Sequence, residues 1–148
     1  MYYKKRMMEK YFEETLRIIA ASLKSVDSTV FSRLVDECYE ALKNGHKVIA
    51  SGLGKNVPIC DKFVGTMLSL GFDAGFLHTN SAVHGDMGMV KPGDLVIILT
   101  KSGSTAESVY LADLLMKREG VNLWLLSFKQ GSVLDRDCRN YLRNFITN

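Results

Sequence analysis

Apolar side chains recur every three or four positions through the first 45 residues, a spacing that predicts two amphipathic helices. The first helix is expected over residues 8–23, and the second begins near Asp27 or Ser28, either of which can cap it. Gly45 can supply the left-handed stop. The apolar stripe of the first helix is Met8, Tyr11, Phe12, Thr15, Ile18, Ile19 and Ser22, and that of the second is Phe31, Leu34, Val35, Cys38 and Leu42. Each helix therefore has one apolar face, which must pack on something.

The pattern changes after Gly45, where short apolar runs alternate with helical segments. The expected strands are residues 47–50, 74–78, 95–99, 122–127 and 141–146, and the expected helices are residues 57–70 and 105–119. Strand–helix–strand order at this spacing requires right-handed crossovers and a parallel sheet. We therefore predict a three-layer α/β sandwich with a five-stranded parallel sheet of flavodoxin-like topology. Residues 1–44 would form its helical lead-in, and residues 45–148 would form the α/β domain proper.

Composition narrows the class of protein. Hydrophobic residues make up 47% of the 148 residues and charged residues 24%, which is typical of one globular domain. The net charge of +3 is small and the basic residues are scattered, so nucleic-acid binding is not expected. The three cysteines form no close pair, which favours a reducing cytoplasm. The sequence shows neither a signal-peptide pattern nor an apolar run of ~18 residues, so we expect no secretion and no membrane span.

Ligands of open parallel sheets bind beyond the carboxyl ends of the strands, so the loops after the strands carry the candidate chemistry. The first is the glycine loop, residues 51–56 (Ser-Gly-Leu-Gly-Lys-Asn), where glycines let the backbone approach a ligand and Lys55 adds a cation. It is not a Walker A loop, because Ile49 stands where that motif needs glycine. It is not a dinucleotide fingerprint either, because Val57 stands where the third glycine belongs. A tight structural turn is the alternative interpretation.

The second is the hydroxyl loop, residues 100–105 (Thr-Lys-Ser-Gly-Ser-Thr), which opens a helix after the most apolar strand. Hydroxyls and helix N-terminal N–H groups together supply the converging donors that a phosphate needs. The alternative is a capping box over residues 104–107, although one hydroxyl would suffice for a cap and this loop has four.

The third is the His84 segment, residues 79–90, which is long for a connection in a compact α/β unit. His84 lies between polar and glycine positions, so it is not expected in the core. His84 and Asp86 supply two potential metal ligands, but no third ligand has a suitable spacing, so we expect no metal.

Taken together, the three loops resemble those of sugar-isomerase (SIS) domains, and more narrowly those of bacterial arabinose-5-phosphate isomerases. The resemblance covers residues 45–128. The resemblance rests on three motifs: the Gly-Leu-Gly-Lys of residues 52–55, the His-Gly-Asp-Met-Gly-Met of residues 84–89 and the hydroxyl loop with Glu107. The His-Gly-Asp part discriminates most, because the hydroxyl loop is a feature of SIS domains generally.

The resemblance implies a role for each matching position. The phosphate-binding hydroxyls would be Ser51, Thr100, Ser102, Ser104 and Thr105. Residues expected against the rest of the substrate are Gly52, Gly54, Gly85, Asp86 and Gly103. Lys55, Glu107 and His84 would be the catalytic residues. In an aldose–ketose isomerisation through an enediol, Glu107 would act as base, Lys55 would stabilise the enediolate oxygen, and His84 would open the ring or carry a proton. This chemistry requires no cofactor.

Three departures from the family pattern matter. Ser104 stands where glutamate is usual, and Lys101 stands where asparagine or glutamine is usual; both raise the local positive charge. The isomerases also continue beyond the fifth strand with a further glutamate and histidine, and many carry regulatory CBS modules, whereas this sequence stops at Asn148. These departures predict either a truncated isomerase or a domain that binds a sugar phosphate without catalysis.

Other functions are compatible with the same topology. They are a non-catalytic phosphosugar sensor, a 3-hexulose-6-phosphate isomerase and a flavodoxin-like cofactor domain. The 3-hexulose-6-phosphate isomerases lack the His-Gly-Asp segment, which counts against the second of these. SIS domains usually pair, with the site shared between subunits, so the resemblance implies a homo-oligomer, a dimer or tetramer. The first amphipathic helix is the candidate interface.

Overall fold

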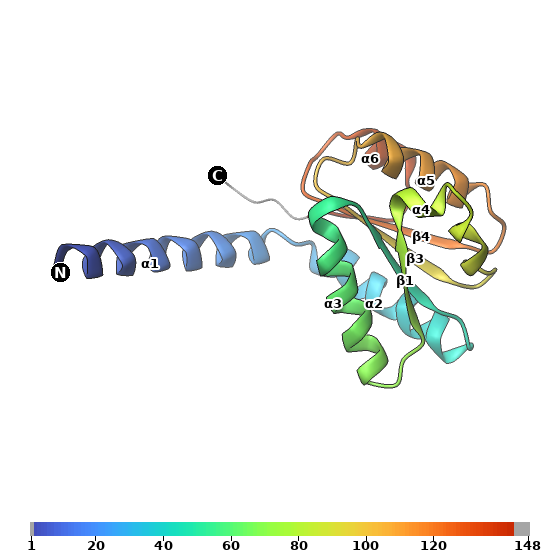
Figure 1. Ribbon diagram of the computed structural model, residues 1–148, viewed down its shortest axis with the longest axis horizontal. Coiled ribbons are helices and arrows are strands. Elements are labelled where there is room, and N and C mark those ends of the chain that lie inside the picture. The colour runs from blue at the N-terminus through green and yellow to red at the C-terminus, as the bar shows by residue number, and fades with distance from the viewer. Residues whose placement is uncertain (1, 144–148) are drawn as a thin grey trace.

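A five-stranded parallel sheet with strand order β2-β1-β3-β4-β5 forms the centre of the fold (Figure 1). The computed structural model describes the backbone of residues 2–143 and the side chains of residues 6–142. The strands are β1 (Val48–Gly52), β2 (Ala74–His78), β3 (Leu95–Thr100), β4 (Asn122–Ser127) and β5 (Tyr141–Arg143). The predicted α/β fold with a five-stranded parallel sheet is confirmed. The part of the last predicted strand beyond Arg143 lies outside the described residues.

Helices cover both faces of this sheet. On one face lie α2 (Ser28–Lys43) and α3 (Val57–Ser69), and on the other lie α5 (Ala106–Met116) and the short α4 (Thr79–Ala82) and α6 (Val133–Asp137). Two 3-10 turns, η1 (Gly54–Asn56) and η2 (Asp86–Met89), follow β1 and α4. The sequence pattern did not predict α4, α6, η1 or η2, because each is five residues or shorter and shows no helical period.

The apolar residues of β3 pack against the helices on both faces of the sheet. Val96 and Ile98 pack with Leu111 on the α5 side, while Leu95 and Ile97 pack on the α2 side. Neighbouring side chains of a strand point to opposite faces, so a strand covered on both sides needs no polar positions. β3 is therefore the central strand that its composition predicts.

Local capping places α2 as expected. The Asp27 carboxylate accepts hydrogen bonds from the backbone N–H groups of Thr29 (2.9 Å) and Val30 (3.1 Å). At the other end, Gly45 has φ +79°, the left-handed conformation that ends a helix at little cost for glycine. Of the predicted apolar stripe of α2, Leu34 is buried against the sheet and Cys38 and Leu42 pack beside it, whereas Phe31 and Val35 are each 49% exposed.

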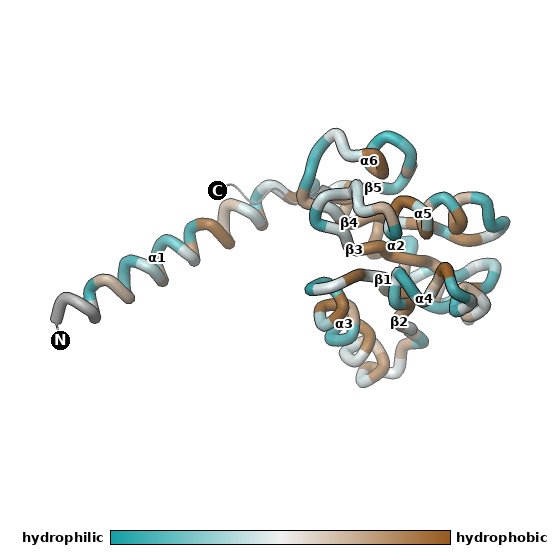
Figure 2. Tube along the Cα trace, turned by 45° about the horizontal axis from the view of Figure 1, so that its top comes forward, coloured by the Kyte–Doolittle hydropathy of each residue, from teal (hydrophilic) through white to brown (hydrophobic). Residues whose placement is uncertain are grey.

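The first helix, α1 (Tyr2–Lys24), behaves differently and projects away from the sheet (Figure 1). Seven of the large apolar side chains that the structure describes in this helix are exposed over 48–66% of their surface: Met7, Met8, Tyr11, Phe12, Leu16, Ile19 and Leu23. Brown apolar and teal polar residues both lie along the helix in Figure 2. The expectation that this face packs on something is therefore not met within the described chain. None of the described helices combines the length and apolarity that crossing a membrane requires.

A partly buried carboxylate joins α2 to the sheet. One oxygen of Glu37 accepts hydrogen bonds from the Trp124 indole and the Asn122 amide, each at 2.6 Å. The Arg33 guanidinium lies 4.9 Å from the centroid of the same indole ring. Because Trp124 is fully buried, its N–H depends on this acceptor.

We therefore expect Glu37→Ala to lower the free energy of unfolding by about 2 kcal/mol, because two donors lose their acceptor. Urea unfolding followed by tryptophan fluorescence measures this change. Glu40→Ala is the matched control, since Glu40 lies on the same helix and its carboxylate pairs with Lys43 at the exposed surface. Equal stability of the two variants would contradict the assigned role of Glu37.

Candidate functional site

A hollow of about 510 Å³ opens where β1 and β3 end side by side. From β1 the chain runs to α3 on one face, and from β3 it runs to α5 on the other, so this is the switch point of the sheet. We call it the switch-point hollow. Its lining residues are Leu53, Gly54, Lys55, Asn56, Leu99, Thr100, Lys101, Ser102, Thr105, Ser108 and Phe128. Both predicted phosphate loops therefore contribute to one concavity.

The charge of the switch-point hollow is positive. Lys55 and Lys101 are exposed at its rim, and no aspartate or glutamate is among the described residues that line it. Two cations and no carboxylate among the lining residues favour an anionic ligand. Lys101, where the family usually has an uncharged amide, thus strengthens the cationic character of the hollow.

The glycine loop holds Lys55 through a tight turn. Gly54 has φ +59° within η1, a conformation that suits glycine. A Cβ at Gly52 would lie 2.9 Å from the Cβ of Asn56 and 3.0 Å from the sulfur of Cys60. The absence of a side chain at Gly52 thus lets the start of α3 pack onto the end of β1. Gly52 itself is not among the residues that line the hollow.

The hydroxyl loop is held by weak internal bonds. The hydroxyl of Thr100 accepts from the Gly103 N–H at 3.2 Å, and the hydroxyl of Ser102 accepts from the Ser104 N–H at 3.3 Å. Thr105 is the N-cap of α5 but makes no side-chain capping bond, so the alternative capping box is not formed. Long bonds of this kind are readily exchanged for stronger bonds to an anion. The first N–H groups of α5 lack partners within the helix and add donors at the same place.

Two predicted phosphate ligands lie outside this lining. Ser51 is fully buried, and its hydroxyl oxygen lies 3.1 Å from that of Thr79. The reason is that β1 continues through Gly52, which places Ser51 inside the sheet instead of in the loop. Ser104 is exposed and outside the lining, while Gly103 is buried where a Cβ would meet the hydroxyl of Ser132. Thr100, Ser102 and Thr105 remain as the lining hydroxyls of the hydroxyl loop.

Neither of the other predicted catalytic groups, Glu107 and His84, is among the described residues that line the hollow. Glu107 is exposed in the first turn of α5, one residue before the buried Ser108, which does line it. His84, Gly85 and Asp86 are exposed, and neither Gly85 nor Asp86 lines the hollow. Gly85 instead lines a separate hollow at the C-terminal end of α5, together with Lys117 and Arg118. The carbonyl oxygen of Met87 accepts a 2.6 Å bond from the guanidinium of Arg118, which fixes η2 against the end of α5.

Sequence reasoning assigned no site role to six lining residues: Leu53, Asn56, Leu99, Lys101, Ser108 and Phe128. Asn56 and Lys101 lie within the two predicted phosphate loops, where site roles were expected only of Lys55, the hydroxyls and the glycines. Ser108 follows Thr105 by three positions, a helical spacing that places both on one face. Phe128 comes directly after β4, at the carboxyl end of the strand next to β3. The signals for Ser108 and Phe128 are thus present in the sequence pattern.

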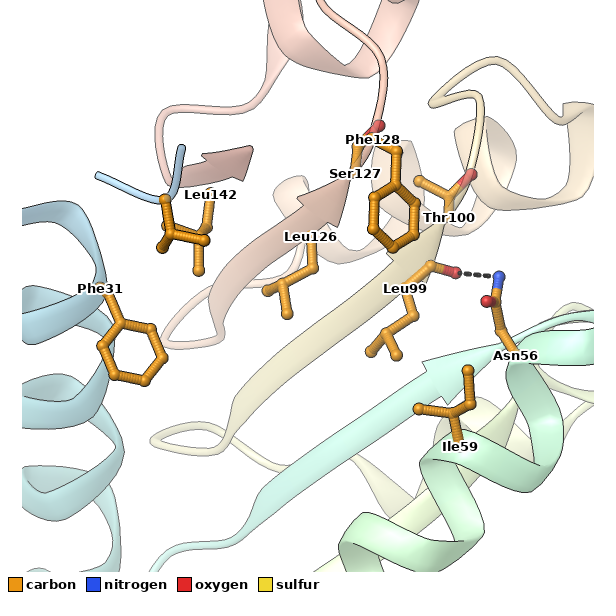
Figure 3. A pocket seen from close by; sticks show the side chains of 10 residues that line it. Phe31, Asn56, Ile59, Leu99, Thr100, Leu126, Ser127, Phe128 and Leu142 are labelled. Atoms are coloured by element: carbon orange, nitrogen blue, oxygen red, sulfur yellow. Dashed lines mark hydrogen bonds between the residues drawn. The ribbon is translucent and has the colours of Figure 1, made fainter. Parts of the chain in front are cut away.

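An apolar cleft of about 270 Å³ adjoins the hollow and shares Asn56, Leu99, Thr100 and Phe128 with it (Figure 3). Its remaining lining residues are Val26, Phe31, Ile59, Leu126, Ser127 and Leu142. Figure 3 shows Phe31 on α2 facing the side chains of the sheet across this cleft. The polar and apolar cavities thus meet at the ends of β3 and β4.

Neither cysteine chemistry nor a metal centre is indicated by the described residues. Burial, followed by the charge of Asp61, raises the pKa of Cys60 to about 11, so its thiol is protonated and a poor nucleophile at neutral pH. Within residues 6–142, no three His, Cys, Asp or Glu side chains gather to hold a metal ion. The polar side chains that line the hollow belong to two lysines, four hydroxyl residues and Asn56.

The chain is similar in sequence and in fold to known proteins. Residues 41–146 match the SIS domain family. The chain is 36% identical over 117 residues to arabinose 5-phosphate isomerase KdsD of Pseudomonas aeruginosa, covering 76% of this chain and 35% of that protein. It is 32% identical over 105 residues to KdsD of Salmonella typhi, covering 71% of this chain and 32% of that protein. The chain thus spans about a third of the length of these relatives.

Among solved structures, a protein of E. coli CFT073 in complex with arabinose 5-phosphate superposes with a TM-score of 0.82 and 27% identity. The match covers 96% of this chain and 73% of that one. The family match extends over most of the chain and includes the glycine loop, the His84 segment and the hydroxyl loop. This chain belongs to the SIS domain family.

Proposed function

We propose that the chain binds a sugar phosphate in the switch-point hollow and interconverts its aldose and ketose forms. The proposed pair is arabinose 5-phosphate and ribulose 5-phosphate. The single observation that supports this most is the convergence of Lys55, Lys101 and the lining hydroxyls on one hollow at the start of α5. The phosphate would accept bonds from Thr100, Ser102 and Thr105. The names of the two KdsD relatives and the sugar phosphate bound in the E. coli CFT073 structure support the substrate class.

The reaction needs a base, a stabiliser of negative charge and an anchor away from the reacting carbons. Binding of the phosphate supplies the anchor and fixes the orientation of the sugar. Glu107, at the first turn of α5, would remove the proton from the carbon next to the carbonyl. Lys55 would face the enediolate oxygen as charge develops there. His84 would assist ring opening or return of the proton. No step requires a cofactor.

Binding without turnover is the second candidate. It is favoured by the exposure of Glu107 and His84, neither of which is among the residues lining the hollow. A base that faces bulk water is poorly placed to work in a closed site. Under this alternative, the hollow would hold the same sugar phosphates, and the chain would act as a sensor.

A ligand panel tests the proposal. Calorimetry would measure the binding of arabinose 5-phosphate, ribulose 5-phosphate and hexose 6-phosphates, with unphosphorylated arabinose as control, and a coupled assay would measure interconversion. We expect pentose phosphate binding, no arabinose binding and conversion in both directions. Binding without conversion would overturn the isomerase and leave the sensor, while absence of phosphosugar binding would overturn both.

We further propose that two copies of the chain associate through α1. The seven large apolar side chains found exposed within residues 6–24 of α1 together present on the order of 700 Å², close to the ~800 Å² that each partner gives to a standard interface. A helix with this much uncovered apolar surface gains free energy by packing against another. The same helix carries charged residues on its other side, which suits a helix half covered by a partner.

Sedimentation velocity at micromolar concentration is expected to show a dimer or larger assembly that Ile19→Glu dissociates. Ile19 lies within the exposed apolar face, so a carboxylate there would have to be buried in the interface. Ala21→Glu is the matched control, because Ala21 is exposed and points about 160° away, on the side of the helix that carries Glu14 and Arg17. A monomeric wild-type protein, or equal effects of the two variants, would contradict the proposal.

A further inference from the structure

Asn56 makes an unusual bond for its position. It is the N-cap residue of α3, where an asparagine side chain ordinarily accepts bonds from the first turn of its own helix. Here the side chain makes no capping bond, and its amide nitrogen donates instead to the carbonyl oxygen of Leu99 at 3.1 Å (Figure 3). The side chain therefore links the start of α3 to a strand 43 residues further along the chain.

The acceptor of this bond lies at a break in the sheet. Leu99 is the last residue of β3 that pairs with β1, opposite Gly52, where β1 leaves the sheet. A carbonyl at such a point needs a donor that the strand no longer supplies. The side-chain amide of Asn56 supplies this donor and so takes the place of a backbone N–H group of β1.

The bond connects the two loops that form the switch-point hollow. Asn56 directly follows Lys55, and Leu99 directly precedes Thr100. The hydrogen bond between Asn56 and Leu99 therefore links the residue next to the lysine of the glycine loop to the residue next to the start of the hydroxyl loop. Asn56 and Leu99 also line both the hollow and the apolar cleft. The lack of a Cβ at Gly52 leaves the space in which the Asn56 side chain sits.

We infer that Asn56 is a positioning residue: its bond to Leu99 holds the Lys55 loop at a set distance from the hydroxyl loop, so that the ammonium and the hydroxyls meet the same ligand. This inference rests on the proposed function of the hollow. It assigns to Asn56 an effect that acts through Lys55 and not through direct contact with the sugar.

A role through Lys55 makes a specific prediction for a double-mutant cycle. Asn56→Ala should weaken the binding of arabinose 5-phosphate and of inorganic phosphate about 10-fold, because the lysine loop is no longer held in register. In a Lys55→Ala background the same substitution should cause almost no further loss, since residues that act through one another are not additive. Asn44→Ala is the matched control, as its amide also donates to a backbone carbonyl, that of Glu40, far from the hollow.

Gly52→Ala is an independent route to the same result. The added Cβ would lie 2.9 Å from the Cβ of Asn56 and 3.0 Å from the sulfur of Cys60, so the start of α3 would shift and carry the Asn56 amide away from Leu99. Binding should then fall by at least a similar factor, although no polar group is removed. Circular dichroism and thermal unfolding of each variant would show that it is folded.

If the wild type binds, two results would overturn the inference. One is that the losses of affinity from Asn56→Ala and Lys55→Ala add in the double variant, and the other is that folded Asn56→Ala binds as tightly as the wild type. A wild-type protein that binds no phosphorylated ligand would instead refute the proposed function, and the inference with it. The two failures are therefore distinguished by the wild-type titration alone.

Discussion

Replacing Glu107 by glutamine is expected to lower kcat for sugar-phosphate isomerisation by a factor of about 10² to 10⁴. Glutamine keeps the shape of the side chain but cannot take a proton from carbon. Because the phosphate is held by other groups, the Kd of the substrate should change only a few-fold.

The alternative role of Glu107 predicts a much smaller effect. A carboxylate in the first turn of a helix interacts favourably with the helix dipole, which is worth about 0.3–1 kcal/mol. Loss of that term would slightly lower stability and would leave turnover intact. Glu119→Gln is the control, because Glu119 is an exposed glutamate just beyond the other end of α5. Full activity in Glu107→Gln would show that the base assignment is wrong.

The fold was predictable because its signals are local. A run such as residues 95–99 is apolar at every position only if both faces of the strand are covered, and β3 shows that arrangement. The ends of helices are also marked locally, by glycines that adopt the left-handed conformation, as Gly45 does after α2. The order of strands and helices then leaves few topologies, since crossovers in parallel sheets are right-handed.

The exact ends of strands were less predictable, and one site residue depends on them. β1 extends to Gly52, two residues beyond the expected end, because Ser51 and Gly52 pair with Ile98 and Leu99 of β3. The hydroxyl of Ser51 consequently lies inside the protein, near that of Thr79. Strand pairing is a long-range property, which the residues of β1 alone do not specify.

The partner of α1 is a second case in which local signals are insufficient. Its helical period correctly predicts a helix with an apolar face, but the period does not say whether the surface that covers it belongs to the same chain. The exposure of Phe12 and Ile19 shows that it is not covered within the described chain. Asn56 is a third case, because its bond to Leu99 exists only after β1 and β3 have been brought together.

Replacing Lys55 by alanine is expected to weaken arabinose 5-phosphate binding and to lower kcat by about 10²- to 10³-fold, the loss typical of one group that stabilises a developing oxyanion. Lys55 is at the rim of the hollow, on the side formed by the glycine loop, while the lining hydroxyls belong to the other loop. Alanine removes the charge while the hydroxyls and the α5 N–H groups remain. The phosphate would therefore keep part of its bonds, and the enediolate would lose its main cation.

A matched set of variants separates charge from structure. Lys62→Ala removes an exposed lysine from α3 whose ammonium donates to Thr66 on the same helix, and it should leave both binding and kcat unchanged. Lys55→Arg keeps the positive charge but alters its geometry, so affinity should be largely retained while kcat falls. Wild-type binding should also weaken as salt is raised, and this salt dependence should be smaller in Lys55→Ala, because a screened ion pair has been removed. If Lys55→Ala retains both affinity and turnover, the hollow does not hold its anion through the glycine loop, and Lys101 alone must supply the cation.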